Sequence, residues 1–348
     1  MFSLPPEVQL DIFKFLNYEE LCSIKLTNLY FRDFIYNFEG ELAREEFEDI
    51  KIGYFSQFKK VPHKLIKIKE NFDFAFFAEQ HKEVNEQIEL KWSNGLQNPI
   101  RLYLPDGGLI SSKVIIWVTK GQEISFSVHN SERHRTILQL PTIIKNKNDI
   151  KTVYYYLNKL FNCHFEYGYF HEFIFNPVLI ELLFGGTPKQ QFFIESFYKV
   201  YNTKNLLKFV LNHLISNYVK INFPHINNKE EYKNILFKIL MNGDKFKGVG
   251  LLFHNRFIVP ELFDFIINQI ETSKDCSKMV DFININRLSI EYTGLNGKAE
   301  KIEEQREYGH LIKAKYQISN KFNPKITFSI LYKILFEMVI DIKIERIY

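Results

Sequence analysis

Beyond residue 150 the chain alternates between short strand-like runs and amphipathic helical segments, and this alternation limits the fold more than any other feature. The strand-like runs begin near Phe165, Gln191, Tyr218, Gly248 and Met279. The step from one run to the next is about 26 to 31 residues, a period typical of repeat proteins. Each unit of a strand–helix repeat buries its apolar face against its neighbours, so we expect a stacked, solenoid-like arrangement over residues 151–296.

Right-handed strand–helix units stacked in parallel predict a curved sheet lined by helices, similar in layout to leucine-rich repeats. The strict L-x-x-L-x-L-x-x-N signature is absent, and a single α/β sheet with helices on both faces is the alternative. Strand alternation turns some side chains away from the helices and toward a possible target protein. The positions selected in this way are Glu166, Glu195, Lys220 and Asn222.

The last fifty residues read as antiparallel strands that close the repeat region. Runs of alternating polarity cover 310–318, 325–331 and 338–347, and Asn323-Pro324 separates the first two. An uncovered sheet edge promotes aggregation, so a solenoid needs a cover at its end. We therefore expect residues 297–348 to form a C-terminal β cap.

The segment before the repeats divides into two parts. Residues 41–98 are expected to be a helical connector, and its basic stretch at 59–69 is interpreted as a solvent-exposed helix face rather than a nucleic-acid site. Residues 99–150 contain short strand-like runs at 100–104, 114–119, 124–128 and 137–140, separated by turn residues. The pairing of these strands is not readable from the sequence.

Residues 1–40 predict three very short helices. Prolines at positions 5 and 6 suit the first turn of a helix, where a missing N–H costs nothing. Asn17 and Glu20 have the spacing of a capping box for the second helix, and Asn28 can cap the third. In the first helix Val8, Ile12 and Phe15/Leu16 form one apolar stripe, while Leu10 and Phe13 form another.

So small a bundle cannot bury two apolar stripes by itself, because a unit of about 40 residues is marginal on its own. The unshielded stripe must be covered by the rest of the chain or by another molecule.

The N-terminal pattern resembles an F-box. The residues that carry the resemblance are Leu4-Pro5-x-Glu7-Val8, then Ile12-Phe13-x-x-Leu16, then Leu21, Leu26 and Phe31-Arg32. Phe31 stands where many F-boxes have Trp, and Lys25 and Thr27 flank Leu26 where other members have smaller or apolar residues.

The resemblance implies a substrate receptor of a Skp–cullin–F-box ubiquitin ligase. It would bind the Skp-type adaptor, and through it the cullin, with these helices, and an unknown protein target with its C-terminal region. A non-enzymatic binding module acting outside a ligase is the alternative. Side chains that would contact the adaptor or brace the helices that do are Leu4, Pro5, Val8, Ile12, Phe13, Leu16, Leu21 and Leu26.

The C-terminal two thirds also resemble the expanded F-box family of plant-parasitic nematodes. The segments that carry this second resemblance are 160–163, 175–177, 272–279 and 316–320.

No motif for catalysis or for a metal or cofactor stands out, so we expect a non-catalytic protein. Cys163-His164 has no Gly-rich elbow, 185–189 lacks the full phosphate-loop pattern, and His129 and His134 lack metal-ligand spacing. Lys and Arg exceed Asp and Glu by four, too small an excess to argue for nucleic acid. We expect a protein of the cytoplasm or nucleus. The sequence has three widely spaced cysteines, no N-terminal leader pattern and no apolar run of membrane-spanning length.

Overall fold

The computed structural model divides the chain into two compact units that interleave in sequence. The first comprises Met1–Leu102, Ser112–Glu166 and Leu179–Phe193, and the second comprises Tyr103–Ser111, Tyr167–Val178 and Ile194–Tyr348. In the residues that the structure describes, no helix is long and apolar enough to cross a membrane. The described residues are 4–67, 85, 86, 88, 90, 99–105, 113–121, 134–170, 173–185, 191–199, 204–223, 229–253, 259–291, 299–307 and 310–347.

The first unit begins with the three predicted helices, α1 (Pro6–Phe13), α2 (Tyr18–Lys25) and α3 (Leu29–Asn37). The capping box is present, because the Asn17 side chain accepts a hydrogen bond from the Glu20 backbone N–H and the Glu20 carboxylate accepts one from the Asn17 N–H. The Asn28 side chain caps α3 by accepting from the Phe31 N–H at 2.9 Å. Local sequence chemistry alone therefore sets where these helices begin.

The first unit continues with strands in the order β8-β1-β5-β6-β2. β1 pairs antiparallel with β5, and β5 antiparallel with β6, whereas β2 runs parallel to β6. The helix α8 begins at its cap, Asn146, whose side chain accepts from the Asp149 N–H. The bounds are β1 (Glu45–Tyr54), α4 (Phe55–Phe58), β2 (Lys64–Lys67), β5 (Val114–Lys120), β6 (His134–Gln139), α8 (Lys147–Phe161) and β8 (Cys163–Tyr169). Two further strands, β3 (Ile100–Arg101) and β7 (Ile143–Ile144), pair with each other.

The helical connector expected at 41–98 is wrong for residues 45–54, which form the strand β1. Ile50 and Ile52 are buried there, and the neighbouring strand β5 is buried along almost its whole length. This strand, which is rich in acidic residues and alternates charge with isoleucine only over 49–52, is stabilised by long-range pairing that no local pattern reveals. The basic stretch is likewise no helix in its described part, because residues 64–67 are the edge strand β2.

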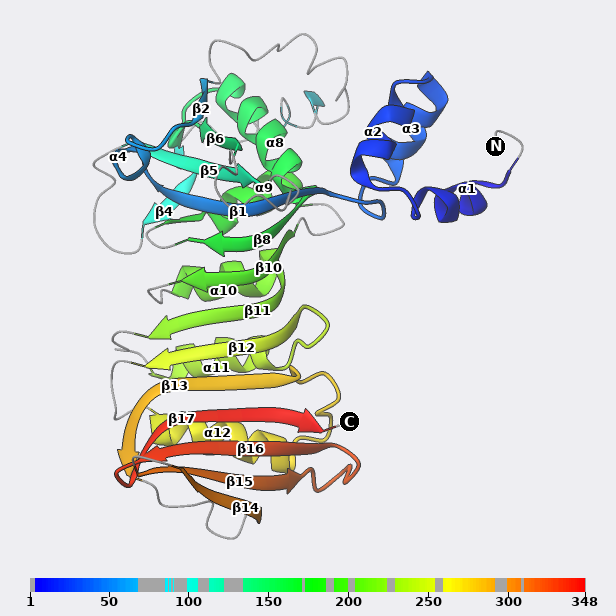
Figure 1. Cartoon of the computed structure of the whole chain (residues 1–348). Coiled ribbons are helices and arrows are strands. Elements are labelled where there is room, and N and C mark those ends of the chain that lie inside the picture. The colour runs from blue at the N-terminus through cyan, green and yellow to red at the C-terminus, as the bar shows by residue number, and fades with distance from the viewer. Residues whose placement is uncertain are drawn as a thin grey trace, which may run out of the picture. The chain divides into compact units, whose positions relative to one another are not determined.

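The second unit shows the predicted alternation of strands and helices. β11 pairs parallel with β12, and β12 parallel with β13. Figure 1 shows α10, α11 and α12 on one face of this sheet. None of the described helices of this unit covers the other face, which disfavours the doubly covered alternative. The bounds are β10 (Phe192–Lys199), α10 (Lys204–His213), β11 (Leu214–Phe223), α11 (Lys229–Leu240), β12 (Phe246–Phe253), α12 (Val259–Thr272) and β13 (Phe282–Glu291). The helix α9 (Pro177–Phe184) lies mostly in the first unit, which contains its residues from Leu179 onward.

The mixed α/β class is therefore correct, and the C-terminal region is a large, mostly strand sheet. The second unit continues from β13 into antiparallel strands in the order β13-β17-β16-β15-β14. The charged run that precedes these strands in sequence is itself a strand, β14. The bounds are β14 (Glu300–Glu307), β15 (Leu311–Ser319), β16 (Thr327–Leu335) and β17 (Met338–Ile347), and a separate pair is formed by β4 (Tyr103–Pro105) and β9 (Phe173–Phe175).

Candidate protein-docking site

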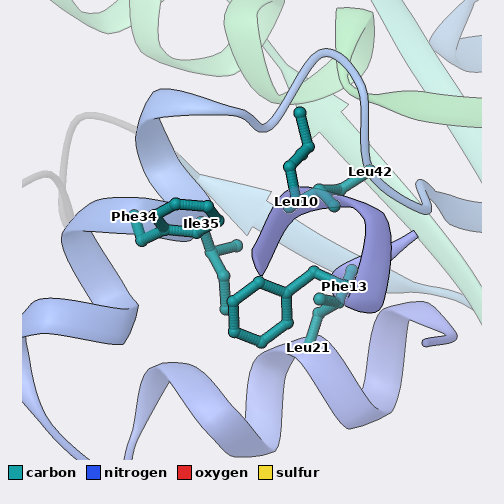
Figure 2. Packing of buried hydrophobic residues seen from close by; sticks show 6 residues of the cluster. All are labelled: Leu10, Phe13, Leu21, Phe34, Ile35 and Leu42. Atoms are coloured by element: carbon teal, nitrogen blue, oxygen red, sulfur yellow. The ribbon is translucent and has the colours of Figure 1, made fainter. Parts of the chain in front are cut away.

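The helix α1 has one buried side and one exposed side. Its buried residues are Gln9, Leu10 and Phe13, and the Phe13 ring contacts the rings of Phe31 and Phe34 at centroid distances of 5.7 and 5.4 Å. Figure 2 shows the core that these side chains share with α2, α3 and the segment after α3. The buried members of this core are Leu10, Phe13, Leu21, Phe34, Ile35 and Leu42.

A buried amide fixes the orientation of α1 against α3. The Gln9 side chain is only 1% exposed, and its Nε2 donates to the Leu4 carbonyl oxygen at 2.7 Å. Its Oε1 accepts from the Tyr30 hydroxyl at 2.8 Å. Because both polar atoms of this buried amide are satisfied, the start of α1 is held in one position relative to α3.

The opposite side of α1 leaves apolar side chains in solvent. Val8 is 43% exposed and Phe15, just after the helix, is 91% exposed. Pro5 is exposed as well, while Ile12 is half-buried. Of the two apolar stripes predicted in this helix, the bundle covers the stripe of Leu10 and Phe13. In the other stripe Val8 and Phe15 are exposed, whereas Ile12 and Leu16 are half-buried and Leu16 packs against the core.

Further apolar side chains are exposed at the junction of α2 and α3. Leu26 is 88% exposed and Leu29 is 66% exposed, and Tyr36 on α3 is 49% exposed. Sequence reasoning selected Leu26 but missed Phe15 and Leu29 as candidates. The sequence signal that could have identified Phe15 and Leu29 is that they lie outside the i, i+3, i+4 spacing that connects the buried residues.

The predicted adaptor-binding residues fall into two groups. Phe13 and Leu21 are buried at 0% and 2% exposure, so they hold the helices together rather than present a surface. The other six have exposed or half-buried side chains: Leu4, Pro5, Val8, Ile12, Leu16 and Leu26.

The segment after α3 ties the bundle to the rest of the first unit. Arg44 donates from a guanidinium nitrogen to the Phe161 carbonyl oxygen at 2.6 Å and lies over the Phe193 ring at 3.6 Å from its centroid. Burial lowers the pKa of Arg44. The Asn162 amide donates to the Glu39 carboxylate at 2.9 Å. These contacts fix the three helices through residues at the C-terminal end of α8.

Cys163 does not form a nucleophilic site with its neighbour His164. The thiol is buried on β8, and burial, reinforced by the nearby Glu45 carboxylate, raises its pKa to about 12. A thiol with a raised pKa carries almost no thiolate at neutral pH, so it is unreactive.

Within the described ranges, no cluster of three His, Cys, Asp or Glu residues could hold a metal ion. His134 and Arg135 begin the strand β6, and Gly185 follows α9. The remaining candidates, His129 and residues 186–189, lie outside the described residues, as do the expected strand at 124–128 and residues 68–69 of the basic stretch.

The four predicted target-contact residues differ in exposure. Glu166 and Glu195 are exposed, Lys220 is half-buried, and Asn222 is only 8% exposed. The Oδ1 atom of Asn222 is buried without a hydrogen-bond partner among the residues described. Asn222 is thus the member of this group least available to a partner.

Residues 1–39 match the family model described as F-box-like. Residues 78–224 match a second model, a domain of unknown function, DUF8381. No curated protein and no solved structure matches the chain. The three N-terminal helices are therefore an F-box-like domain, a class whose members typically act as non-catalytic adaptors, and this class suggests a Skp-type binding partner.

Proposed function

We propose that this protein is a substrate-recognition adaptor of a Skp–cullin–F-box ubiquitin ligase. The F-box-like helices bind the Skp-type adaptor, which connects them to the cullin, and the C-terminal region binds a protein target. The observation that carries the proposal is the exposed side of α1, where Pro5 and Val8 lie in solvent although the opposite side is packed.

Apolar side chains that a helix exposes to water are unfavourable in a free protein, and their burial against a partner favours complex formation. Burial of apolar surface contributes roughly 25 cal/mol per Å². A few central side chains usually dominate such an interface, and truncating one of them costs about 2 kcal/mol or more. Val8 and Ile12 occupy successive turns of α1, so one partner groove can cover both.

The proposal assigns no bond-making chemistry to this chain. An adaptor of this kind holds its target near a ubiquitin-loaded conjugating enzyme that other subunits carry. Ubiquitin transfer becomes faster because the effective concentration of the target near that enzyme is raised. We place this activity in the cytoplasm or nucleus, where Skp–cullin–F-box ligases act. The exposed Glu195 of the second unit and, separately, the exposed Glu166 of the first unit are the candidate target contacts.

The test is adaptor binding by the full chain, measured by calorimetry with a purified Skp-type adaptor. The double variant Leu4→Ala/Ile12→Ala should lose at least about tenfold in affinity, which corresponds to about 1.4 kcal/mol. The backbone carbonyl of Leu4 still accepts from Gln9 in the variant, so α1 should remain in place. Equal affinities for wild type and variant would contradict the proposal.

A matched control removes an exposed apolar side chain outside the F-box-like domain. Phe322 in the second unit is 60% exposed, so Phe322→Ala deletes comparable apolar surface. We expect this variant to bind the adaptor like wild type. Circular dichroism of all three proteins verifies that any loss of affinity is not a loss of folding.

A binding module that acts outside a ligase remains the second candidate function. It would occupy the adaptor without assembling with cullin, as a host-directed protein could, in keeping with the resemblance to nematode F-box proteins. Co-elution of adaptor and cullin with the wild-type chain supports the ligase function. Adaptor binding without cullin supports the second candidate.

The proposal includes no nucleic-acid partner. Lys59, Lys60 and Lys64 are exposed, and Lys64 lies on the edge strand β2. A nucleic-acid site would retain an oligonucleotide at about 50 mM salt and release it as the salt concentration rises. We expect no retention under these conditions.

A further inference from the structure

The strand β14 is the end strand of the second unit, and no other described strand pairs with its outer edge. It pairs antiparallel with β15, from Glu300 opposite Gln317 to Glu307 opposite Leu311. All eight of its residues are exposed, and among the described strands none lies beyond it. Its outward backbone N–H and C=O groups can therefore pair with an incoming strand.

This edge lacks two of the devices that commonly block strand addition. β14 is eight residues long and contains no proline, although its register with β15 shifts between Lys301 and Glu303. Beyond that shift, residues 303–307 pair continuously with β15. A regular five-residue edge is long enough to accept an extended peptide.

The side chains of β14 favour a basic partner. The strand carries Glu300, Glu303, Glu304 and Glu307 against Lys301 and Arg306. Both basic residues form ion pairs with Glu304 of the same strand. The other three glutamates, Glu300, Glu303 and Glu307, have no basic partner on β14 itself, although Glu307 pairs with Lys313 of β15. An incoming strand would meet their negative charges.

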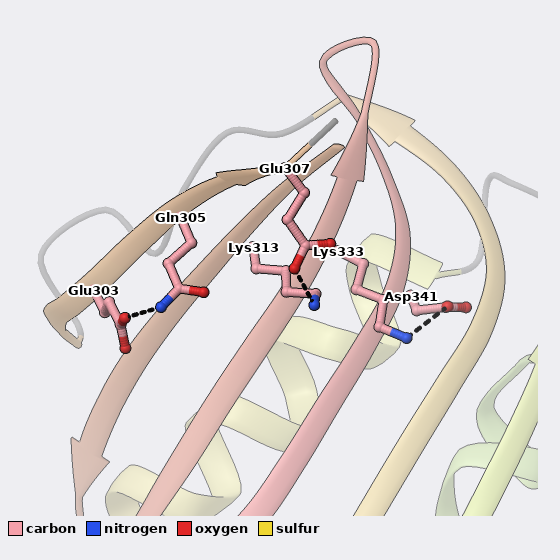
Figure 3. A network of polar contacts seen from close by, with 6 residues as sticks. All are labelled: Glu303, Gln305, Glu307, Lys313, Lys333 and Asp341. Atoms are coloured by element: carbon pink, nitrogen blue, oxygen red, sulfur yellow. Dashed lines mark hydrogen bonds and ion pairs between the residues drawn. The ribbon is translucent and has the colours of Figure 1, made fainter. Parts of the chain in front are cut away.

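Figure 3 shows what the glutamates of β14 contact on the sheet. Glu307 pairs with Lys313 of β15, whereas Glu303 accepts a hydrogen bond from the neutral Gln305 amide. Lys333 of β16 is paired with Asp341 of β17 at 4.0 Å. Lys315 of β15 lies opposite Glu303 in register. Because β15 is on the side of β14 away from the free edge, Lys315 does not occupy the place of an incoming strand.

A second copy of this chain fits the full length of the edge poorly. Centred antiparallel pairing of two β14 strands would place Glu300 opposite Glu307, Lys301 opposite Arg306 and Glu303 opposite Glu304. Like charges directly opposite each other destabilise a strand pair. A register shifted by two residues would pair Glu303 with Arg306 but would leave only residues 302–307 in the ladder, so the charge pattern opposes full-length self-pairing.

We propose that the free edge of β14 binds an extended segment rich in lysine or arginine by strand addition. Backbone hydrogen bonds would supply the pairing, and the glutamates would select basic side chains at alternate positions. The inference deepens the proposed function, on which it rests for its biological meaning, because it assigns this chemistry to the target.

The test uses the full chain without any adaptor and a fluorescent octapeptide of alternating lysine and valine, with anisotropy as the readout. We expect binding of this peptide and none of the glutamate–valine octapeptide. A lysine–valine peptide with N-methyl groups along one edge should bind much more weakly, since it cannot form the ladder. Equal binding of the N-methylated peptide, or no binding of the parent peptide, would overturn the proposal.

Charge-neutral variants locate the site. Each exposed ion pair is worth up to about 1 kcal/mol, so Glu300→Gln/Glu303→Gln should weaken peptide binding by roughly threefold to tenfold. Glu345→Gln is the matched control, because β17 is paired on both sides and has no free edge. Unchanged affinity in the double variant would rule out β14 as the site. Because the adaptor is absent, failure here leaves the proposed adaptor binding untouched.

Discussion

The F-box-like domain and the second unit are both rich in aromatic side chains, but they bury them differently. In the second unit the largest fully buried side chains include six phenylalanines: Phe170, Phe173, Phe175, Phe197, Phe209 and Phe246. In the F-box-like domain Phe13 is fully buried, whereas Phe15, two residues later, is 91% exposed. The second unit also exposes single rings, such as Phe322 at 60%, whereas in the F-box-like domain the exposed Val8 and Phe15 belong to one apolar stripe.

The difference follows from size. Three short helices offer one small core, and that core is filled by residues such as Leu10 and Phe13. The sheet of the second unit offers a long surface against which three helices pack. Since a small unit buries a smaller fraction of its surface, its leftover apolar residues indicate a partner only when they form a stripe, as they do on α1.

The largest expected effect comes from emptying the small core. Phe13→Ala should destabilise the F-box-like domain by about 3–5 kcal/mol, because it removes a fully buried ring and leaves a cavity. Amide hydrogen exchange of residues 4–38 measures this local loss. The helices α1 and α3 should lose protection first, since the Phe13 ring contacts Phe31 and Phe34.

Phe15→Ala is the control for this change, with the same side chain removed two residues away. An exposed substitution usually changes stability by less than about 0.5 kcal/mol. Exchange protection in this variant should match wild type. Similar losses from Phe13→Ala and Phe15→Ala would break the distinction between a packed and an exposed side of α1.

The second unit permits a test of a different kind, because its open sheet face is packed by rings over glycines. A Cβ on Gly248 would lie 2.0 Å from the Phe282 ring, which stacks on Tyr218 at 5.8 Å between centroids. Gly248→Ala should therefore displace the stacked pair and destabilise the protein by about 1–3 kcal/mol. Urea unfolding followed by tyrosine fluorescence measures the change.

Gly121→Ala is the matched control in the first unit, where an added Cβ meets nothing within 4 Å. This variant should be neutral or slightly stabilising, because alanine restricts the unfolded chain more than glycine. If both glycine variants behaved alike, the open face would be loosely packed, and the contrast with the F-box-like domain would weaken.

Much of the F-box-like domain could be predicted because its signals are local. The capping residues Asn17 and Asn28 and the i, i+4 spacing within α1 lie within a few residues of the bonds they form. Which stripe of α1 stays exposed could not be predicted, since it depends on the tertiary contacts of Gln9 with Tyr30.

The failures concern strands whose partners are distant in sequence. β1 pairs with β5, more than sixty positions away at Asp49 and Thr119, so nothing near residue 49 indicates a strand. β2, which lies in the stretch expected to be a helix face, likewise pairs with β6 at Lys64 and Thr136. Strand preference depends on such neighbours more than helix preference does.

The smallest effect should come from the hairpin between β16 and β17. Leu335 pairs with Met338, so Phe336 and Glu337 form a two-residue turn in which both have positive φ, 48° and 65°. Such turns favour Asn-Gly, because a bulky residue is strained in this conformation. Phe336 is 68% exposed and contacts only the His310 ring among the described aromatic pairs, at 5.3 Å.

Replacing these two residues by the preferred pair, Phe336→Asn/Glu337→Gly, should stabilise the protein by about 1 kcal/mol through relief of backbone strain. Urea unfolding measures the gain, and Phe336→Ala, which keeps the strained backbone, is the control and should show no gain. A loss of stability in the double variant would mean that the ring contact between Phe336 and His310 outweighs the strain. Phe336 would then have a packing role despite its exposure, in contrast to Phe15 of the F-box-like domain, and exposure alone would not separate the two regions.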